Sequence, residues 1–132
     1  MNEEVKMELA GSAWTLVSFE TDIGVILAAT EAPATLTFSA EGEQAGRLGG
    51  SGGCNRYFAS YTLTSDRLHI SPLGSTRMMC SPVRMAQEVR FFQALAAASR
   101  CELSNGELLI VSAGGTLRFA PTTASAAGEA QP

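Results

Sequence analysis

The chain has 132 residues, enough for one domain with a single core, and its 45% hydrophobic and 17% charged residues are typical of a globular protein. Its net charge of −4 disfavours binding to nucleic acid or to an anionic membrane through bulk electrostatics, because neutralising phosphates requires clustered Lys and Arg. No apolar run approaches the length of a bilayer-spanning helix, so we expect no membrane span.

The first half of the chain alternates apolar and polar residues between turn signals, a pattern that predicts β-strands. We expect a strand at 14–19, a variable loop at 21–33, and a strand at 35–39 that points Leu36 and Phe38 inward. Further strands are expected at 44–48, 57–63 and 67–71, the last two forming a hairpin with Tyr61, Leu63, Leu68 and Ile70 in the core. The glycine-rich residues 49–53 should let the backbone bend between strands.

One helix is predicted, over about 82–99. Ser81 is its expected N-cap, and Pro82 suits the first helical position because its missing N–H costs nothing there. The apolar stripe that should cover the sheet or the end of a barrel consists of Met85, Val89, Phe92 and Ala96. The polar residues expected on the other faces are Arg84, Gln87, Glu88 and Gln93.

The last third predicts a three-stranded meander around two short turns, Asn105-Gly106 and Gly114-Gly115. With these as two-residue loops, the expected pairs are Leu103 with Leu108, Cys101 with Ile110, Ile110 with Phe119 and Ser112 with Leu117. One face would then carry Cys101, Leu103, Leu108, Ile110, Leu117 and Phe119. Together with the earlier strands, this meander makes the protein mainly β.

Three cysteines leave one unpaired. The meander register places Cys101 in the core as a small hydrophobic residue, which leaves Cys54 and Cys80 as the pair available for a bridge. That bridge would close a loop of 27 residues, 54 through 80, stabilise the fold by about 3 to 4 kcal/mol and require an oxidising compartment. The alternative is two reduced cysteines in a cytosolic protein, and the residues alone leave both readings open.

The sequence offers no catalytic or cofactor signature. No Lys-Ser or Lys-Thr follows residues 49–53, so they do not indicate a phosphate-binding loop, and one histidine without a Cys-x-x-Cys motif leaves too few metal ligands. His69 lies between Leu68 and Ile70 in an alternating strand and should point away from the core, so it is a poor catalytic base for Cys54. We expect no catalytic residue, cofactor or metal.

Polar and amphipathic residues flank the two cysteines of the candidate bridge, and they form the candidate interaction surface: Asn55, Arg56, Tyr57, Thr76 and Arg77. Met78 and Met79 lie beside them and are interpreted as packing residues. A thiol enzyme or redox sensor is a third class of function, which would require Cys54 or Cys80 to be an exposed thiolate of low pKa.

The order of the motifs resembles a META domain of the HslJ type. The residues that carry the resemblance are Trp14-Thr-Leu, Leu-Thr-Phe at 36–38, Gly-Gly-Cys-Asn-Arg-Tyr at 52–57, Thr-Arg-Met-Met-Cys at 76–80, the helix with Gln87-Glu88, and Leu-Arg-Phe at 117–119. The resemblance spans about residues 11–120. It leaves residues 1–10 as an N-terminal extension and 121–132 as a tail that we expect to be disordered.

The resemblance implies a small, cracked or lipocalin-like antiparallel β-barrel with one packed helix. Domains of this kind are found mainly in bacterial envelope proteins, often lipoproteins or secreted proteins, and are linked to heat-shock induction and novobiocin resistance. No enzymatic activity is attached to the family. The positions that carry over as signature residues, without a catalytic role, are Cys54, Asn55, Thr76, Arg77, Cys80 and Glu88.

We therefore expect a non-enzymatic envelope domain, periplasmic or anchored to the outer membrane, that contacts a protein or another envelope component. The polar start of the chain is not a secretory signal, so the alternatives are a cytoplasmic protein or a mature domain, with a lipid anchor in a longer precursor, whose signal has been removed. The second functional hypothesis is a lipocalin-like binder of a small apolar ligand. An eight-stranded barrel either fills with side chains or holds one ligand, so the fold alone does not decide between them.

Overall fold

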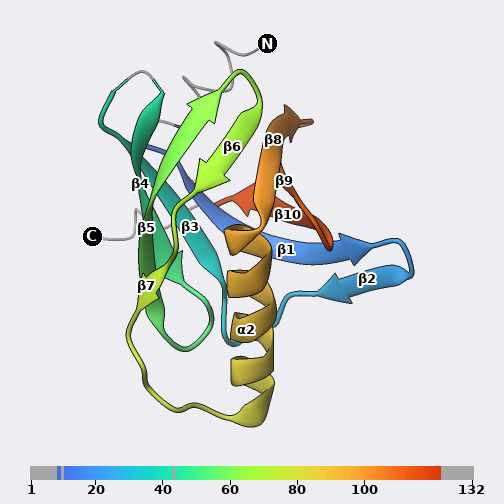
Figure 1. Cartoon of the computed structure of the whole chain (residues 1–132). Helices are drawn as coiled ribbons and strands as arrows, with labels where there is room; N and C mark the ends of the chain where they lie inside the picture. The colour runs from blue at the N-terminus through green and yellow to red at the C-terminus, as the bar shows by residue number, and fades with distance from the viewer. Residues whose placement is uncertain (1–8, 10, 43, 123–132) are drawn as a thin grey trace.

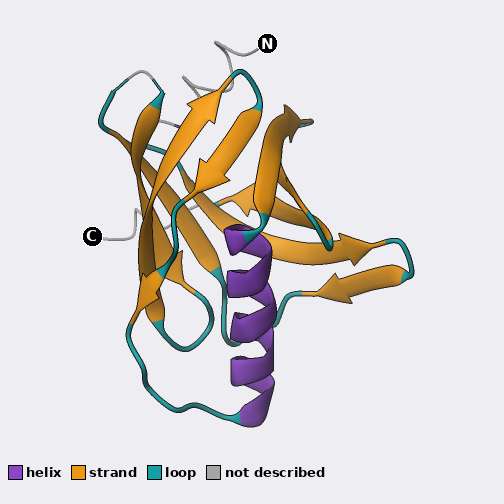
Figure 2. Ribbon diagram, in the orientation of Figure 1, coloured by secondary structure: helices purple, strands orange, loops and turns teal. Residues whose placement is uncertain are grey.

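The computed structural model describes residue 9, residues 11–42 and residues 44–122. Its sheet has ten strands, eight of which form a closed antiparallel barrel (Figures 1 and 2). The barrel strands, in their order around the ring, are β1 (Ala13–Thr21), β3 (Thr35–Ala40), β4 (Ala45–Ser51), β5 (Arg56–Thr64), β6 (Arg67–Ile70), β8 (Ala98–Ser104), β9 (Glu107–Ser112) and β10 (Gly115–Pro121), which pairs again with β1. The prediction of a mainly β barrel with a packed helix is confirmed.

Strict alternation along the strands directs large side chains into the barrel. Leu36 and Phe38 of β3 are buried as predicted, and every second residue of β5 from Tyr57 to Leu63 is buried. The other two strands lie off the ring: β7 (Gly74–Ser75) pairs with β5, and β2 (Gly24–Leu27) pairs with the second half of β1. The loop predicted at 21–33 is therefore interrupted by a strand.

The first meander turn has the predicted register, and the second does not. Leu103 pairs with Leu108 across Asn105-Gly106, but Ser112 pairs with Gly115, so the second loop is Ala113-Gly114. Gly115 is the first residue of the strand, and a side chain at this position would collide with the carbonyl oxygen of Glu20 on β1. The corrected register pairs Ile110 with Leu117 and Leu108 with Phe119. Because it shifts by an even number of residues, the same side chains still face the core.

Helix α2 (Pro82–Ala96) ends three residues before the predicted end, because the chain joins the sheet at Ala98, which pairs with Ser112. Its start is as predicted: the Ser81 hydroxyl accepts a hydrogen bond from the Arg84 N–H at 3.4 Å. The predicted buried stripe is wrong, since Val89 is 50% exposed. The helix instead buries Gln87, Glu88, Phe91, Ala94 and Leu95.

Phe91 is the main apolar link between helix and barrel. Its ring centroid lies 6.1 Å from that of Phe119 on β10 and 5.7 Å from that of Tyr57 on β5. Offset and edge-to-face aromatic pairs at these separations add to the free energy gained by burial. The helix therefore covers one opening of the barrel instead of lying across its wall (Figure 1).

The domain extends beyond the predicted limits of 11–120. Leu9 was assigned to an N-terminal extension, yet its side chain is 1% exposed and belongs to the core. Pro121 ends β10, and the Thr122 N–H donates to the Ala13 carbonyl at 2.9 Å. The predicted tail therefore begins no earlier than residue 123, and 123–132 lie outside the described residues.

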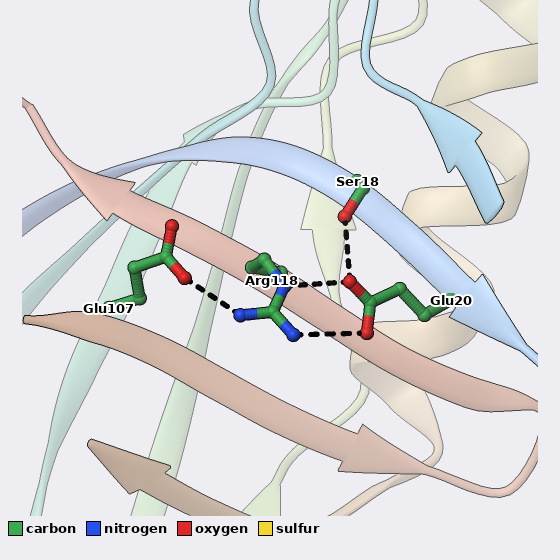
Figure 3. Close-up of polar contacts among 4 residues, drawn as sticks. All are labelled: Ser18, Glu20, Glu107 and Arg118. Atoms are coloured by element: carbon green, nitrogen blue, oxygen red, sulfur yellow. Dashed lines mark hydrogen bonds and ion pairs between the residues drawn. The ribbon is translucent and has the colours of Figure 1, made fainter. Parts of the chain in front are cut away.

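An ion-pair network crosses the seam where β10 meets β1 (Figure 3). Arg118 Nε donates to Glu20 Oε2 at 2.6 Å, Arg118 Nη2 to Glu20 Oε1 at 3.2 Å, and Arg118 Nη1 to Glu107 Oε1 at 2.7 Å. The Ser18 hydroxyl also donates to Glu20, at 3.2 Å. The hydrogen bond from Arg118 holds the pKa of Glu20 below its usual value, despite the opposing effect of burial.

This lowered pKa predicts a loss of stability in acid. A carboxylate whose pKa is depressed by folding stabilises the protein above its unfolded-state pKa, and that stability is lost as the pH falls through the folded-state pKa. Between about pH 6 and pH 3, the unfolding free energy of Glu20→Gln should therefore fall less than that of the wild type, and the difference should be small because solvent screens this partly exposed pair. Urea unfolding at several pH values measures this. Arg118→Gln should flatten the same acid limb, and curves that all run parallel would contradict the prediction.

Candidate functional site

The signature residues meet at the barrel end where α2 begins. They come from the β4–β5 connection at 52–55, from the segment 76–81 that leads from β7 into the helix, and from α2 itself. A disulfide joins Cys54 to Cys80, with Cα atoms 6.1 Å apart, and so ties the two connections together. We call residues 76–81 the latched loop.

Cys101 is a free thiol in a different environment. It is 0% exposed in the barrel core, and burial raises its pKa to about 12. A thiol so rarely ionised is a poor nucleophile and packs as a small hydrophobic residue. The sulfurs of Cys54 and Cys80 are bonded to each other in the disulfide.

Asn55 fixes the latched loop through its side-chain amide, which is buried at 3% exposure. Its Oδ1 accepts from the Met78 N–H at 2.6 Å and from the Thr76 hydroxyl at 2.9 Å. Its Nδ2 donates to the Met78 carbonyl at 3.2 Å and to Glu88 Oε2 at 2.7 Å. Both acceptor sites and both donors of the amide are therefore used, which defines one position for the loop.

Glu88 is the centre of this cluster, with its side chain on the second turn of α2 and 4% exposed. Its carboxylate accepts three N–H groups: the Asn55 backbone at 2.6 Å, the Cys54 backbone at 3.2 Å and the Asn55 amide. A carboxylate is costly to bury unless such donors replace its water. Gly52 permits the close approach, because a Cβ there would lie 2.8 Å from Glu88 Cγ.

Gln87, the neighbouring helix residue, holds a third loop in the same way. Its Oε1 accepts from the Ala29 N–H at 2.8 Å, and its Nε2 donates to the Ala32 carbonyl at 2.8 Å and the Gly52 carbonyl at 3.4 Å. Gly53 has φ +113°, and a Cβ at this position would lie 2.6 Å from Gln87 Nε2. The bend predicted at the glycines thus serves two close approaches to the helix.

The structure divides the candidate interaction surface. Arg56, Thr76 and Arg77 are exposed, although the Thr76 hydroxyl is bonded to Asn55. Asn55 and Tyr57 are buried, at 3% and 2% exposure, and offer no surface to a partner. Tyr57 alternates inward along β5, its hydroxyl donates to the Thr35 carbonyl at 2.6 Å, and burial raises its pKa.

The two methionines of the latched loop are exposed, so their interpretation as packing residues is wrong. Met78 is 55% and Met79 87% exposed, and Val83 at the start of α2 is 68% exposed. The hydrogen bonds of Asn55 go to the backbone of Met78, which leaves its side chain outside. The exposed methionines therefore follow the exposed Arg77 along the latched loop. The buried Asn55 side chain fixes the backbone of this loop through its bonds to Met78.

His69 and, apart from Glu88, the acidic side chains that the structure describes lie outside this cluster. His69 is exposed on β6, as its place in the alternation predicts. Among the described residues, no three His, Cys, Asp or Glu side chains gather to hold a metal ion. The polar atoms of the signature cluster bind one another, so what this arrangement does is position a loop.

Loss of the Asn55 amide should destabilise the whole domain. Asn55→Ala removes the side-chain bonds to Thr76, Met78 and Glu88 and leaves the Met78 N–H and one Glu88 oxygen without these partners. The expected cost is about 2 to 4 kcal/mol, measured by urea unfolding. The control Gln93→Ala, at an exposed position of the same helix, should cost less than about 0.5 kcal/mol. Equal effects of the two substitutions would contradict the structural role of Asn55.

The disulfide should stabilise the domain by restricting the unfolded chain. Cys54→Ser combined with Cys80→Ser should lower the unfolding free energy by about 3 to 4 kcal/mol, because the unfolded chain regains the entropy of a 26-residue separation. Alkylation of the denatured wild-type protein should find one free thiol, rising to three after reduction. Three free thiols before reduction would show that the bridge does not form.

Comparisons with known proteins agree with this architecture. The sequence model of the META domain family matches residues 7–124. An NMR structure of a protein from Burkholderia xenovorans is 29% identical, with a TM-score of 0.77 over 92% of this chain and 89% of that chain. A second protein structure solved by NMR, 22% identical, shares the fold with a TM-score of 0.66 over 87% of this chain and 92% of that one. No curated protein matches the chain. Since the family match covers most of its length, the chain belongs to the META domain family.

Proposed function

We propose that this protein is a non-enzymatic, HslJ-type domain of the bacterial envelope that binds a protein or another envelope component through its latched loop. The observation that carries the proposal is the contrast within that loop. The Met78 backbone is fixed by the buried Asn55 amide, while the side chains of Arg77, Met78 and Met79 are exposed.

A loop of this kind is suited to binding. Ordering a flexible segment costs free energy on association, and a loop already held by hydrogen bonds and a disulfide avoids most of that cost. Methionine side chains adapt to irregular apolar surfaces, and arginine is enriched at the centres of protein interfaces. Arg77 and Met79 supply both properties at one end of the molecule.

The disulfide also supports the proposed location. A bridge between Cys54 and Cys80 forms and persists in oxidising compartments, which favours a periplasmic or outer-membrane-anchored domain over a cytoplasmic one. A role in heat-shock or novobiocin response is part of the proposal and rests on the HslJ resemblance. Within the described part of the chain, no helix has the length and hydropathy needed to cross a bilayer.

The barrel interior favours a macromolecular partner over a small apolar ligand. Interior positions are occupied by large side chains, among them Phe91, Phe119 and Leu36, each at most 1% exposed. A cavity of about 10 Å³ lies beside the helix, lined in part by Phe19 and Ile26, and has room for about one water molecule. The lipocalin-like hypothesis would require these side chains to move apart.

A comparative pull-down tests the proposal. The oxidised protein, immobilised at one terminus, is exposed to bacterial envelope extract, and bound proteins are quantified by mass spectrometry. The double variant Arg77→Glu, Met79→Ser should recover about tenfold less of the partner than the wild-type protein does. This corresponds to a loss of about 1.4 kcal/mol of binding free energy at a hot spot.

The matched control for the pull-down changes the same residue classes away from the loop. Arg67 and Val89 are both exposed, so Arg67→Glu with Val89→Ser should fold normally and bind as the wild type does. Equal loss in both double variants, or no protein enriched by the wild type above uncoupled resin, would overturn the proposal.

A further inference from the structure

Strand β2 ends the sheet, with a free edge that the latched loop does not share. In the order of paired strands β2 is last, and within the described residues its sheet partner is β1 alone. Its sequence, Gly24-Val-Ile-Leu27, contains no charged residue and no proline. Exposed strand edges in natural proteins usually carry such residues, which discourage pairing with another strand. β2 is therefore an unprotected edge.

The side chains of this hairpin are unusually apolar for their exposure. Ile23 is 93% exposed, Val25 60%, Ile26 41% and Leu27 76%. The hairpin projects sideways from the barrel, so β2 lies clear of the other strands (Figure 1). A two-stranded arm with apolar residues on both faces gains stability when a third strand is added.

The hydrogen bonds of the hairpin reveal which backbone groups are free. Thr21 pairs with Gly24 around the two-residue turn, and the Ala28 N–H donates to the Val17 carbonyl at 3.0 Å. Backbone groups alternate in direction along a strand, so Gly24, Ile26 and Ala28 face β1. The N–H and C=O groups of Val25 and Leu27 consequently point to the open side.

We propose that two copies of this protein associate by antiparallel pairing of β2 with β2, about a two-fold axis at Ile26. In this register Val25 of each copy lies opposite Leu27 of the other, and the outward groups form four N–H···O bonds across the axis. The contact extends the sheet from one copy into the next. Its two apolar faces bring valine against leucine on one side and isoleucine against isoleucine on the other.

A second copy is the occupant that this edge selects. The unpaired groups require an extended backbone, and the other copy presents the same groups, so one contact satisfies both free edges. The paired segment 24–28 contains no charged side chain, so the contact places no like charges opposite one another, and the net charge of −4 on each copy acts only from residues outside the segment. An interface of one short strand is smaller than a standard one, and we expect a weak dimer with Kd about 10 to 100 µM.

Sedimentation velocity over about 5 to 500 µM oxidised protein tests the dimer directly, since this range brackets the expected Kd. The mean mass should rise from 13.8 kDa towards twice that value. Leu27→Lys adds a charge at the edge and should raise Kd at least about tenfold. Met79→Lys, which changes an exposed apolar side chain on the latched loop, should dimerise as the wild type does.

A variant that changes the backbone of β2 distinguishes strand pairing from nonspecific hydrophobic association. Val25→Pro deletes an outward N–H while keeping the inward groups of Gly24 and Ile26, so it should remain monomeric and unfold at the wild-type urea midpoint. A wild-type protein that stays monomeric at the highest concentration would overturn the proposal. So would undiminished association of folded Leu27→Lys and Val25→Pro, since the contact would then lie elsewhere.

Discussion

The hydrogen-bonded pair of Glu88 and Asn55 is the constraint on which the functional end of this molecule depends. Glu88 is a buried carboxylate whose charge is satisfied by N–H groups of the β4–β5 connection. Asn55 in turn accepts hydrogen bonds from Thr76 and Met78, and the disulfide links the same two segments covalently. Burying a carboxylate without hydrogen-bond donors would cost several kcal/mol of desolvation free energy. The helix and the two loops must therefore adopt these positions together.

This arrangement assigns different tasks to neighbouring signature residues. Asn55 and Glu88 are buried and hydrogen-bonded to each other, and Cys54 and Cys80 are half-buried and joined by the disulfide. These residues fix the backbone of the latched loop, and the side chains of Arg77, Met78 and Met79 on that loop are exposed. In this chain Asn55, Glu88 and the disulfide hold the loop, and the exposed side chains of Arg77, Met78 and Met79 lie between its two fixed ends.

Local signals predicted much of the fold. Alternation placed Leu36 and Phe38 in the core, and Asn105-Gly106 set the register of its hairpin, because these patterns depend on nearby residues. The site was harder to predict. Gln87 and Glu88 are polar and were expected outside, yet they are buried because their partners come from loops more than 30 positions away in sequence. The available signal was the position of Glu88, which the resemblance marks as a signature residue, next to Gln87 on the helix.

Asn55 and Glu88 should make the latched loop rigid, and amide hydrogen exchange measured by NMR can detect that rigidity residue by residue. The N–H groups of Asn55 and Met78 lie outside the barrel strands but donate to buried oxygens at 2.6 Å. If Asn55 and Glu88 hold the loop, both amides should exchange about as slowly as amides of the barrel core, while that of the neighbouring Met79 should exchange much faster. Exchange of Asn55 and Met78 at the rate of Met79 would contradict it.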